Sequence, residues 1–212
     1  MNTAIDRVSE RRSLLSIGIL FFVFGFFTWL NSILIPYFRI ICEIGWFEAF
    51  LVTAAFYISY FLLAIPSALL LERISLIRGI LIGLGLIILG SLIFIPAAIY
   101  RSFPIFLIGL FLQGAGLTLM QTASNLYVTL LGSIESAAKR ISIMGIANKI
   151  AGALGGLILG GVLFGSTKAQ DISSHISQLS AADRIAYLDN LAHSIIPPYL
   201  IMAICLIALM FI

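Results

Sequence analysis

Apolar residues occur along this chain in long runs, and polar residues gather in the short segments between those runs. Six of the runs are expected to form membrane-spanning helices, because about 20 residues of α-helix cross the hydrocarbon core of a bilayer. The expected spans are residues 13–38, 46–71, 79–100, 104–131, 141–164 and 195–212. A charged tail, residues 1–12, precedes them, and a polar loop, about residues 166–194, separates the last two. The pattern predicts an all-α fold, an integral membrane bundle of six helices over residues 13–212.

Composition agrees with a membrane protein and leaves no length for an attached soluble domain. Of the 212 residues, 61% are apolar and 10% are charged, whereas about a quarter of the residues in soluble domains are charged. The sequence contains no HExxH, no GxSxG and no cluster of Cys and His residues, so we expect neither an enzyme nor a metal site. The net charge of +3 indicates basic residues at a membrane surface rather than a nucleic-acid interface.

The positions of the basic residues predict the orientation, because Lys and Arg are retained on the cytoplasmic side of a membrane. One side of the bundle holds Arg7, Arg11, Arg12, Arg73, Arg78, Lys139 and Arg140, and the other holds Arg39, Arg101, Lys168 and Arg184. We therefore expect a multi-pass protein of the plasma or inner membrane with a cytoplasmic amino terminus. In the outer loop, QLSAADRIAYLDNLA favours a short surface helix with Ser180 as its N-cap. Alternatively, this loop only tethers two spans.

Polar residues inside the apolar runs are the first candidates for function, and they gather in the first and fourth spans. Thr28, Asn31 and Ser32 share one helical face, and Gln121 and Asn125 lie one turn apart. Carboxamides both donate and accept hydrogen bonds, which suits a neutral hydroxylated ligand. The alternative is that these groups bond neighbouring helices or, for Thr and Ser, their own backbone. For the three carboxamides together we favour a polar cavity.

Lys149 and Trp29 are two further candidates inside the spans. An ammonium at the centre of a span costs roughly 2.5 to 3.5 kcal/mol on insertion scales. Lys149 therefore either has a function or extends to the cytoplasmic interface, about two turns away. Trp29 is a candidate stacking platform for a sugar ring, because an aromatic face meets the apolar face of a pyranose. Gly152 and Gly156 belong to a small-residue stripe that predicts a close helix contact, or a contact between two copies of the chain.

Three runs carry a resemblance to a known family. They are FFVFGFFTWLNSILIPYF, LVTAAFYISYFLLAIPSALLLERI and QTASNLYVTLLGSIESAAKRISIMGIANKIAG. Over about residues 14–157 the chain resembles the fucose permease branch of the major facilitator superfamily, most closely its glucose/galactose transporters. The resemblance implies a hexose transporter with alternating access, in which the first and fourth helices line a central cavity. Transporters of this family have two six-helix halves, and this chain resembles the amino-terminal half alone.

The resemblance also implies roles for individual residues. Fucose/proton members have an Asp in the first helix and a Glu in the fourth, where this chain has Ser32 and Gln121. That difference puts proton coupling by this pair in doubt and keeps sodium open as the coupling ion; no other cofactor is expected. Asn148 matches an Asn that is similar to a sugar contact of the fucose permease.

The expected hexose site therefore consists of Trp29, Asn31, Ser32, Gln121, Asn125 and Asn148. Glu72, Arg73 and Arg78 loosely match the basic gating loop between the second and third helices of the superfamily. We expect a truncated or split amino-terminal half whose partners are a sugar, the lipid bilayer and a second six-helix half, as a separate chain or a second copy. Alternatively, the chain is a non-transporting or self-associating membrane protein.

Overall fold

The computed structural model describes residues 2–131, 134–165 and 169–211, with side chains from residue 14 onward except at 31–32, 169–170 and 173. Its helices are α1 (Asn2–Ile41), α2 (Trp46–Arg73), α3 (Leu76–Ile99), α4 (Phe103–Leu130), η1 (Ile134–Ser136), α5 (Ala137–Phe164), α6 (Ala169–Gln178), α7 (Ala181–His193) and α8 (Ile196–Leu209). In these residues, five helical segments are long and apolar enough to cross a membrane, or six if the two parts of α1 form one span. The prediction of an all-α membrane fold is confirmed.

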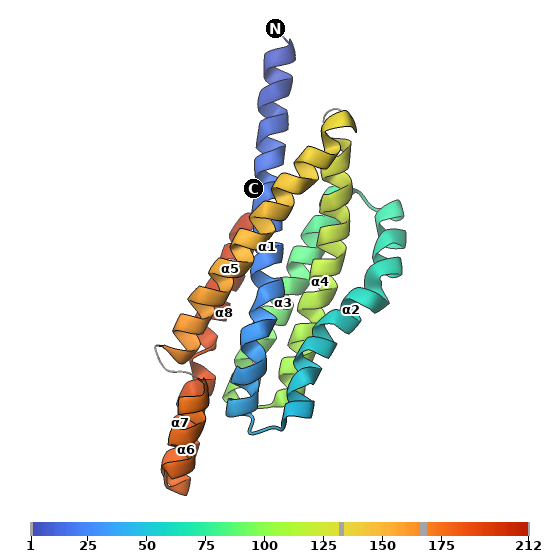
Figure 1. The fold of residues 1–212 in the computed structure, drawn as a ribbon. Coiled ribbons are helices and arrows are strands. Elements are labelled where there is room, and N and C mark those ends of the chain that lie inside the picture. The colour runs from blue at the N-terminus through green and yellow to red at the C-terminus, as the bar shows by residue number, and fades with distance from the viewer. Residues whose placement is uncertain (1, 132–133, 166–168, 212) are drawn as a thin grey trace.

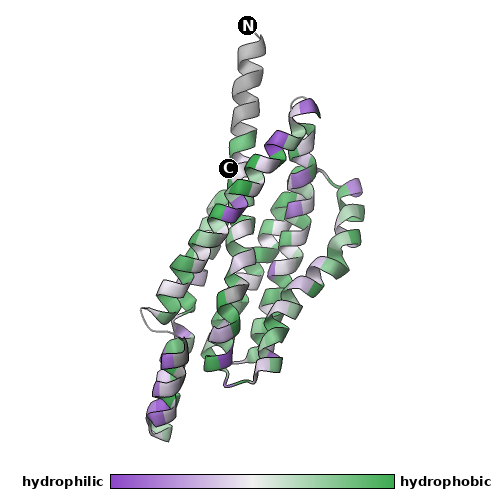
Figure 2. Ribbon diagram, in the orientation of Figure 1, coloured by the Kyte–Doolittle hydropathy of each residue, from purple (hydrophilic) through white to green (hydrophobic). Residues whose placement is uncertain are grey.

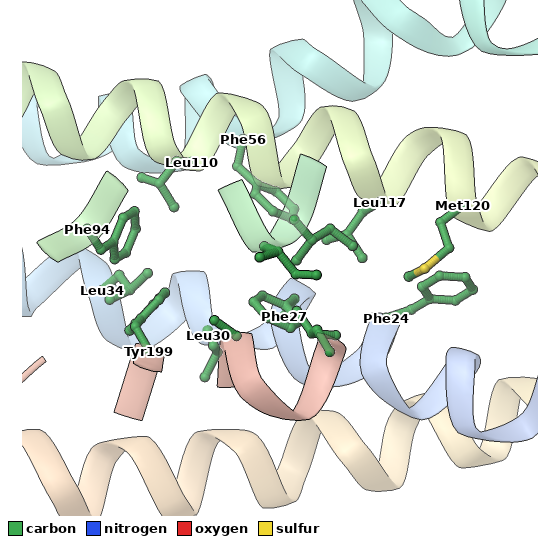
Figure 3. Packing of buried hydrophobic residues seen from close by; sticks show 14 of the residues in the cluster. Phe24, Phe27, Leu30, Leu34, Phe56, Phe94, Leu110, Leu117, Met120 and Tyr199 are labelled. Carbon is green, nitrogen blue, oxygen red and sulfur yellow. The ribbon is translucent and has the colours of Figure 1, made fainter. Parts of the chain in front are cut away.

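The long helices lie side by side in one bundle (Figure 1). The most extensive pairings join α3 to α4, α1 to α5, α2 to α4, and α3 to α8. Figure 3 shows the interior, where Phe24 and Phe27 of α1 lie among side chains of α2, α4 and α8. Lipid tails are as apolar as these side chains, so close packing rather than transfer from water holds such a bundle together. The least buried span is α2. Of an apolar stretch of 18 residues in α2, 22% is buried, whereas 61% of the corresponding stretch in α4 is buried.

Helix α1 is bent near the predicted site. Its segments Leu14–Leu30 and Ile33–Ile41 are inclined at 44° to each other. Pro36 lies in the second segment. Because proline has no N–H and its ring displaces the carbonyl four residues earlier, a bend is expected about one turn before it.

Glycines allow α3 and α4 to approach backbone to backbone. A Cβ atom on Gly83 of α3 would lie 2.7 Å from the carbonyl oxygen of Gly116 of α4. One on Gly90 would lie 2.6 Å from the carbonyl oxygen of Gly109. In each helix the two glycines are seven residues apart, which is two helical turns and places them on one face. The pairing of α3 with α4 therefore depends on the absence of four side chains.

A second close approach joins α1 to α5. The indole of Trp29 lies where a Cβ atom on Gly152 would be, and Gly25 of α1 lies against the backbone of Asn148. The predicted close contact of the glycine-rich fifth span is therefore present for Gly152, and its partner is α1 of the same chain. Packing within one chain accounts for this part of the stripe.

The segment between α5 and α8 contains two helices, α6 and α7, at the end of the bundle away from the amino terminus (Figure 1). Helix α7 is the predicted surface helix, and Ser180 caps it by accepting a hydrogen bond from the backbone N–H of Asp183. The two helices enclose a small core with the end of α1, formed by Ile40, Ile172, Ile176 and Leu188. The hydroxyl of Tyr37 in α1 donates to the carbonyl of Leu191 over 2.7 Å. These contacts favour a docked surface helix over a simple tether.

Charged residues fasten α7 to the loops of the bundle. Arg101, between α3 and α4, donates to the carbonyl of Ile41 over 2.8 Å and to the carboxylates of Asp189 and Glu43 over 3.3 and 3.4 Å. Arg184 of α7 also pairs with Glu43. The Arg101 side chain is 19% exposed, whereas the two carboxylate side chains are 42% and 49% exposed. Arg101 is therefore the inner hub of this network.

Arg101→Gln is expected to loosen α7, because one side chain satisfies a carbonyl and two carboxylates. Charged hydrogen bonds contribute about 1.5 to 3 kcal/mol when buried and less when solvent screens them. We expect backbone amides of α7 to exchange about tenfold faster, measured by hydrogen–deuterium exchange in detergent. Arg184→Gln is the matched control, since Arg184 is half-exposed and its ion pair is with Glu43 alone. Equal exchange in the two variants would contradict the hub role of Arg101.

Candidate functional site

The described candidate side chains form two groups. Trp29, Asn148 and Lys149 meet where α1 packs on α5, and we call them the α1–α5 cluster. Gln121 and Asn125 lie one turn apart on α4, and we call them the α4 pair. No hydrogen bond joins the two groups within the described residues. The side chains of Asn31 and Ser32 lie outside the described part of the structure.

Trp29 and Lys149 form the centre of the α1–α5 cluster. The Lys149 ammonium lies 5.6 Å from the centroid of the Trp29 ring system, within the range of a cation–π interaction. The Trp29 side chain is 45% exposed, and its indole rests against Gly152, which has no side chain to displace it. The ring is therefore held in place while nearly half of it is accessible.

Lys149 lies well inside α5, away from both ends of the helix. Helix α5 begins at Ala137, so at 1.5 Å per residue Lys149 is about 18 Å from its start. The ammonium lies over the ring of Trp29, which is 12 residues before the end of α1. Lys149 forms no ion pair with any described residue. A cation–π contact returns about 0.5 to 2 kcal/mol of the roughly 2.5 to 3.5 kcal/mol that an ammonium costs at the centre of a span, and a function for Lys149 stays a prediction.

Asn148 completes the α1–α5 cluster. Its Nδ2 donates to the carbonyl of Phe21 in α1 over 3.3 Å. Among the described residues its Oδ1 has no partner, so that oxygen can accept a hydrogen bond from a ligand. The side chain is half-buried, and the bond to α1 fixes its direction.

Several polar residues of α4 serve the helices themselves. Thr118 donates to the carbonyl of Gly114, and Thr122 donates to the carbonyl of Thr118. The buried amide of Gln113 donates to Ser91 of α3 over 3.3 Å. For these three residues, the alternative that polar groups bond the backbone or a neighbouring helix is confirmed.

The α4 pair differs from those residues, because neither side chain forms a hydrogen bond within the described structure. Gln121 is half-buried and Asn125 is exposed. Figure 2 shows scattered hydrophilic turns in an otherwise largely apolar bundle. Two carboxamides without internal partners in an apolar environment are available to bind a polar ligand.

Comparisons with known proteins agree with a transporter fold. No protein-family model matches the chain. The chain is 40% identical over 138 residues to the glucose/galactose transporter of Brucella abortus, covering 65% of this chain and 34% of that protein. It is 34% identical over 193 residues to the L-fucose-proton symporter of Escherichia coli, covering 90% of this chain and 44% of that protein.

The solved structures decide the fold. The crystal structure of the major facilitator superfamily transporter FucP in the outward conformation superposes with a TM-score of 0.78 at 31% identity. The match covers 93% of this chain and 48% of FucP. This chain has the fold of one half of a major facilitator transporter. The chain spans between a third and a half of the length of these two curated relatives. Those relatives are transporters, which confirms the prediction that the chain is not an enzyme.

The segment predicted to act in gating lies where α2 meets α3. Glu72 and Arg73 end α2, and Arg78 lies in the first turn of α3, where its backbone N–H donates to the side chain of Ser75. All three charged side chains are exposed, and none forms an ion pair with another described residue. Their role in gating stays a prediction.

Two open hollows in the described structure lie away from the predicted sugar-binding residues. One hollow of about 510 Å³ lies between α1, α3 and the end of α8, and one of about 540 Å³ lies between α1 and α5. Neither is lined by Trp29, Asn148 or the α4 pair. Trp29, Lys149 and Asn125 are exposed, and Gln121 and Asn148 are half-buried.

Two polar residues of the half-transporter were not singled out from the sequence. Tyr60 of α2 reaches the Thr28 side chain of α1 with its hydroxyl. Arg140 of α5 is buried and donates to the carbonyls of Val128 and Thr129 at the end of α4. The signal for Tyr60 was hidden among many aromatic residues. Arg140 is in the first turn of α5, a few residues after the end of α4. That position could have indicated an arginine that binds the last carbonyls of α4.

Proposed function

We propose that the chain is the amino-terminal half of a sugar transporter that works by alternating access. The observation that carries the proposal is the α4 pair, two carboxamides in a span with no internal hydrogen bond, in a half-transporter similar to proteins named for glucose/galactose and L-fucose transport. The substrate is a hexose. Its hydroxyl groups exchange hydrogen bonds with Gln121, Asn125 and Asn148, and its ring packs on Trp29. Asn31 and Ser32 extend the site along α1.

A second six-helix half completes the site in this proposal. Binding pockets enclose most of a small ligand's surface, whereas the candidate groups here are on the open side of one half. In transporters with two repeats, one half rocks against the other around a site near the bilayer midplane. A separate chain or a second copy of this one supplies the missing wall, and Glu72, Arg73 and Arg78 belong to the gating loop.

The coupling ion and the orientation form part of the same proposal. Gln121 has no titratable group, and Ser32 stands where fucose/proton members have an Asp. A proton relay through these two positions is therefore not proposed, and sodium or a proton bound elsewhere drives uptake. The distribution of basic residues supports a plasma or inner membrane location with a cytoplasmic amino terminus.

Counterflow of labelled glucose, galactose and fucose in proteoliposomes tests the proposal. Gln121→Ala is expected to lower uptake about tenfold, since each hydrogen bond to a neutral ligand contributes about 0.5 to 1.5 kcal/mol. Gln178→Ala is the matched control, because Gln178 is exposed in α6, outside the candidate groups. Uptake that is unchanged in Gln121→Ala contradicts the site, and a wild-type chain without uptake favours the non-transporting alternative.

A further inference from the structure

Lys149 is the charged side chain nearest to the middle of any described span. In α1 to α5, the other charged residues with described side chains lie at or near helix ends: Arg39, Glu48, Glu72, Arg73, Arg78, Lys139 and Arg140. Helix α5 continues for four turns on the far side of Lys149, to Phe164. The cation is therefore isolated from other charges along its own helix.

Among the described residues, Lys149 has an aromatic contact but no salt bridge. Its ammonium lies 5.6 Å from the Trp29 centroid, and the adjacent Asn148 directs its amide nitrogen to the Phe21 carbonyl. The described salt bridges all lie at the far end of the bundle, around Glu43. The described part of the α1–α5 cluster thus carries a net charge of +1, and both the ammonium and the indole are exposed.

We propose that the sugar taken by this site carries a carboxylate, as a hexuronate does. This inference rests on the proposed function and specifies its substrate class. The carboxylate pairs with the Lys149 ammonium, the ring contacts the exposed part of Trp29, and a ring hydroxyl donates to Oδ1 of Asn148. A charge-assisted hydrogen bond in an apolar environment is stronger than a neutral one, so Lys149 sets the preference for an acidic sugar over its neutral counterpart.

Tryptophan fluorescence tests the inference directly, because the chain contains two tryptophans, Trp29 and Trp46. Trp46 lies at the start of α2 and stacks with Arg39, away from the cluster. In a Trp46→Phe background, Trp29 becomes the single reporter of binding. The probes are galacturonate and glucuronate, with galactose and glucose as their neutral counterparts, added to the full chain in detergent.

The expected result is that each hexuronate binds at least tenfold more tightly than its neutral counterpart. Lys149→Met should abolish this difference, and Lys149→Arg should retain most of it. Binding of neutral sugars in Lys149→Met also shows that this variant folds. If it binds none, far-ultraviolet circular dichroism and size-exclusion chromatography separate misfolding from a lost site, and Lys149→Arg then carries the test.

Three outcomes overturn the inference. If the chain with Lys149 unchanged binds acidic and neutral sugars equally tightly, the inference of an acidic substrate is wrong. The proposed function is then unaffected. Acetate that binds as tightly as the hexuronates shows a general anion contact rather than a sugar site. If no sugar of either class changes Trp29 fluorescence, the proposed function fails together with the inference.

Discussion

Gly25→Ala is expected to lower the stability of the bundle by about 3 kcal/mol, at the upper end of the usual range for overpacking. The added Cβ would lie 2.6 Å from the carbonyl carbon and 2.8 Å from the Cα of Asn148. It would also overlap the carbonyl oxygen of Asn148. These are backbone atoms of a helix, so no side-chain rotation relieves the overlap. Helices α1 and α5 must separate, and that separation also removes the packing of Trp29 on Gly152.

Thermal unfolding in detergent, followed by fluorescence-detected size exclusion, measures this effect. Gly85→Ala is the matched control, because no heavy atom outside its own helix lies within 4 Å of the added Cβ. Alanine has a higher helix propensity than glycine, so the control should be as stable as the wild type or slightly more stable. A melting temperature of Gly25→Ala equal to that of Gly85→Ala would contradict the close approach of α1 and α5.

Arg140→Ala is expected to destabilise the junction of α4 and α5 by about 3 kcal/mol. The buried guanidinium donates to the carbonyl of Val128 over 3.1 Å and to that of Thr129 over 3.3 Å, and it also bonds the Ser136 hydroxyl. The last carbonyls of a helix have no partner within that helix, and a cation there also favours the helix dipole. Its removal leaves buried carbonyls unsatisfied, which costs about 1 to 3 kcal/mol for each group.

Lys139→Ala provides the control for Arg140→Ala. It removes the same charge from the same first turn of α5, so any effect on membrane orientation is matched, but the Lys139 side chain is exposed. Unfolding of the two variants by denaturant in detergent should separate them clearly, with Lys139→Ala within about 0.5 kcal/mol of wild type. Equal losses of stability would show that charge, rather than capping of α4, explains the effect.

The helices could be predicted because each depends on nearby residues. The sequence predicts spans over residues 79–100 and 104–131, and the structure has α3 at Leu76–Ile99 and α4 at Phe103–Leu130. Helix α6 was missed because AQDISSHISQ is short and polar, and its apolar residues bury themselves against Ile40 of α1. Such a contact between distant parts of the chain leaves no local signal.

The candidate site was predictable by residue type but not by arrangement. Gln113 and Gln121 are the same residue in the same span, yet the rotation of α4 turns Gln113 to Ser91 of α3 and leaves Gln121 without a partner. The position of Lys149 over Trp29 depends on the register of α5 against α1, which Gly25 and Gly152 set by close contact. Helix rotation and register follow from packing between segments far apart in the sequence.

The weak burial of α2 has a consequence for how this half can move. Helices α1 and α5 are locked by backbone contact at Gly25, and α3 and α4 by the facing glycines, so each pair shifts as one piece. Helix α2 has an extensive contact only with α4. Of the helices long and apolar enough to span a membrane, it has the smallest buried share. A helix that tilts loses packing contacts, so the least packed helix tilts at the lowest cost. We therefore expect α2 to tilt more readily than the other helices, with Pro66 as the hinge within it.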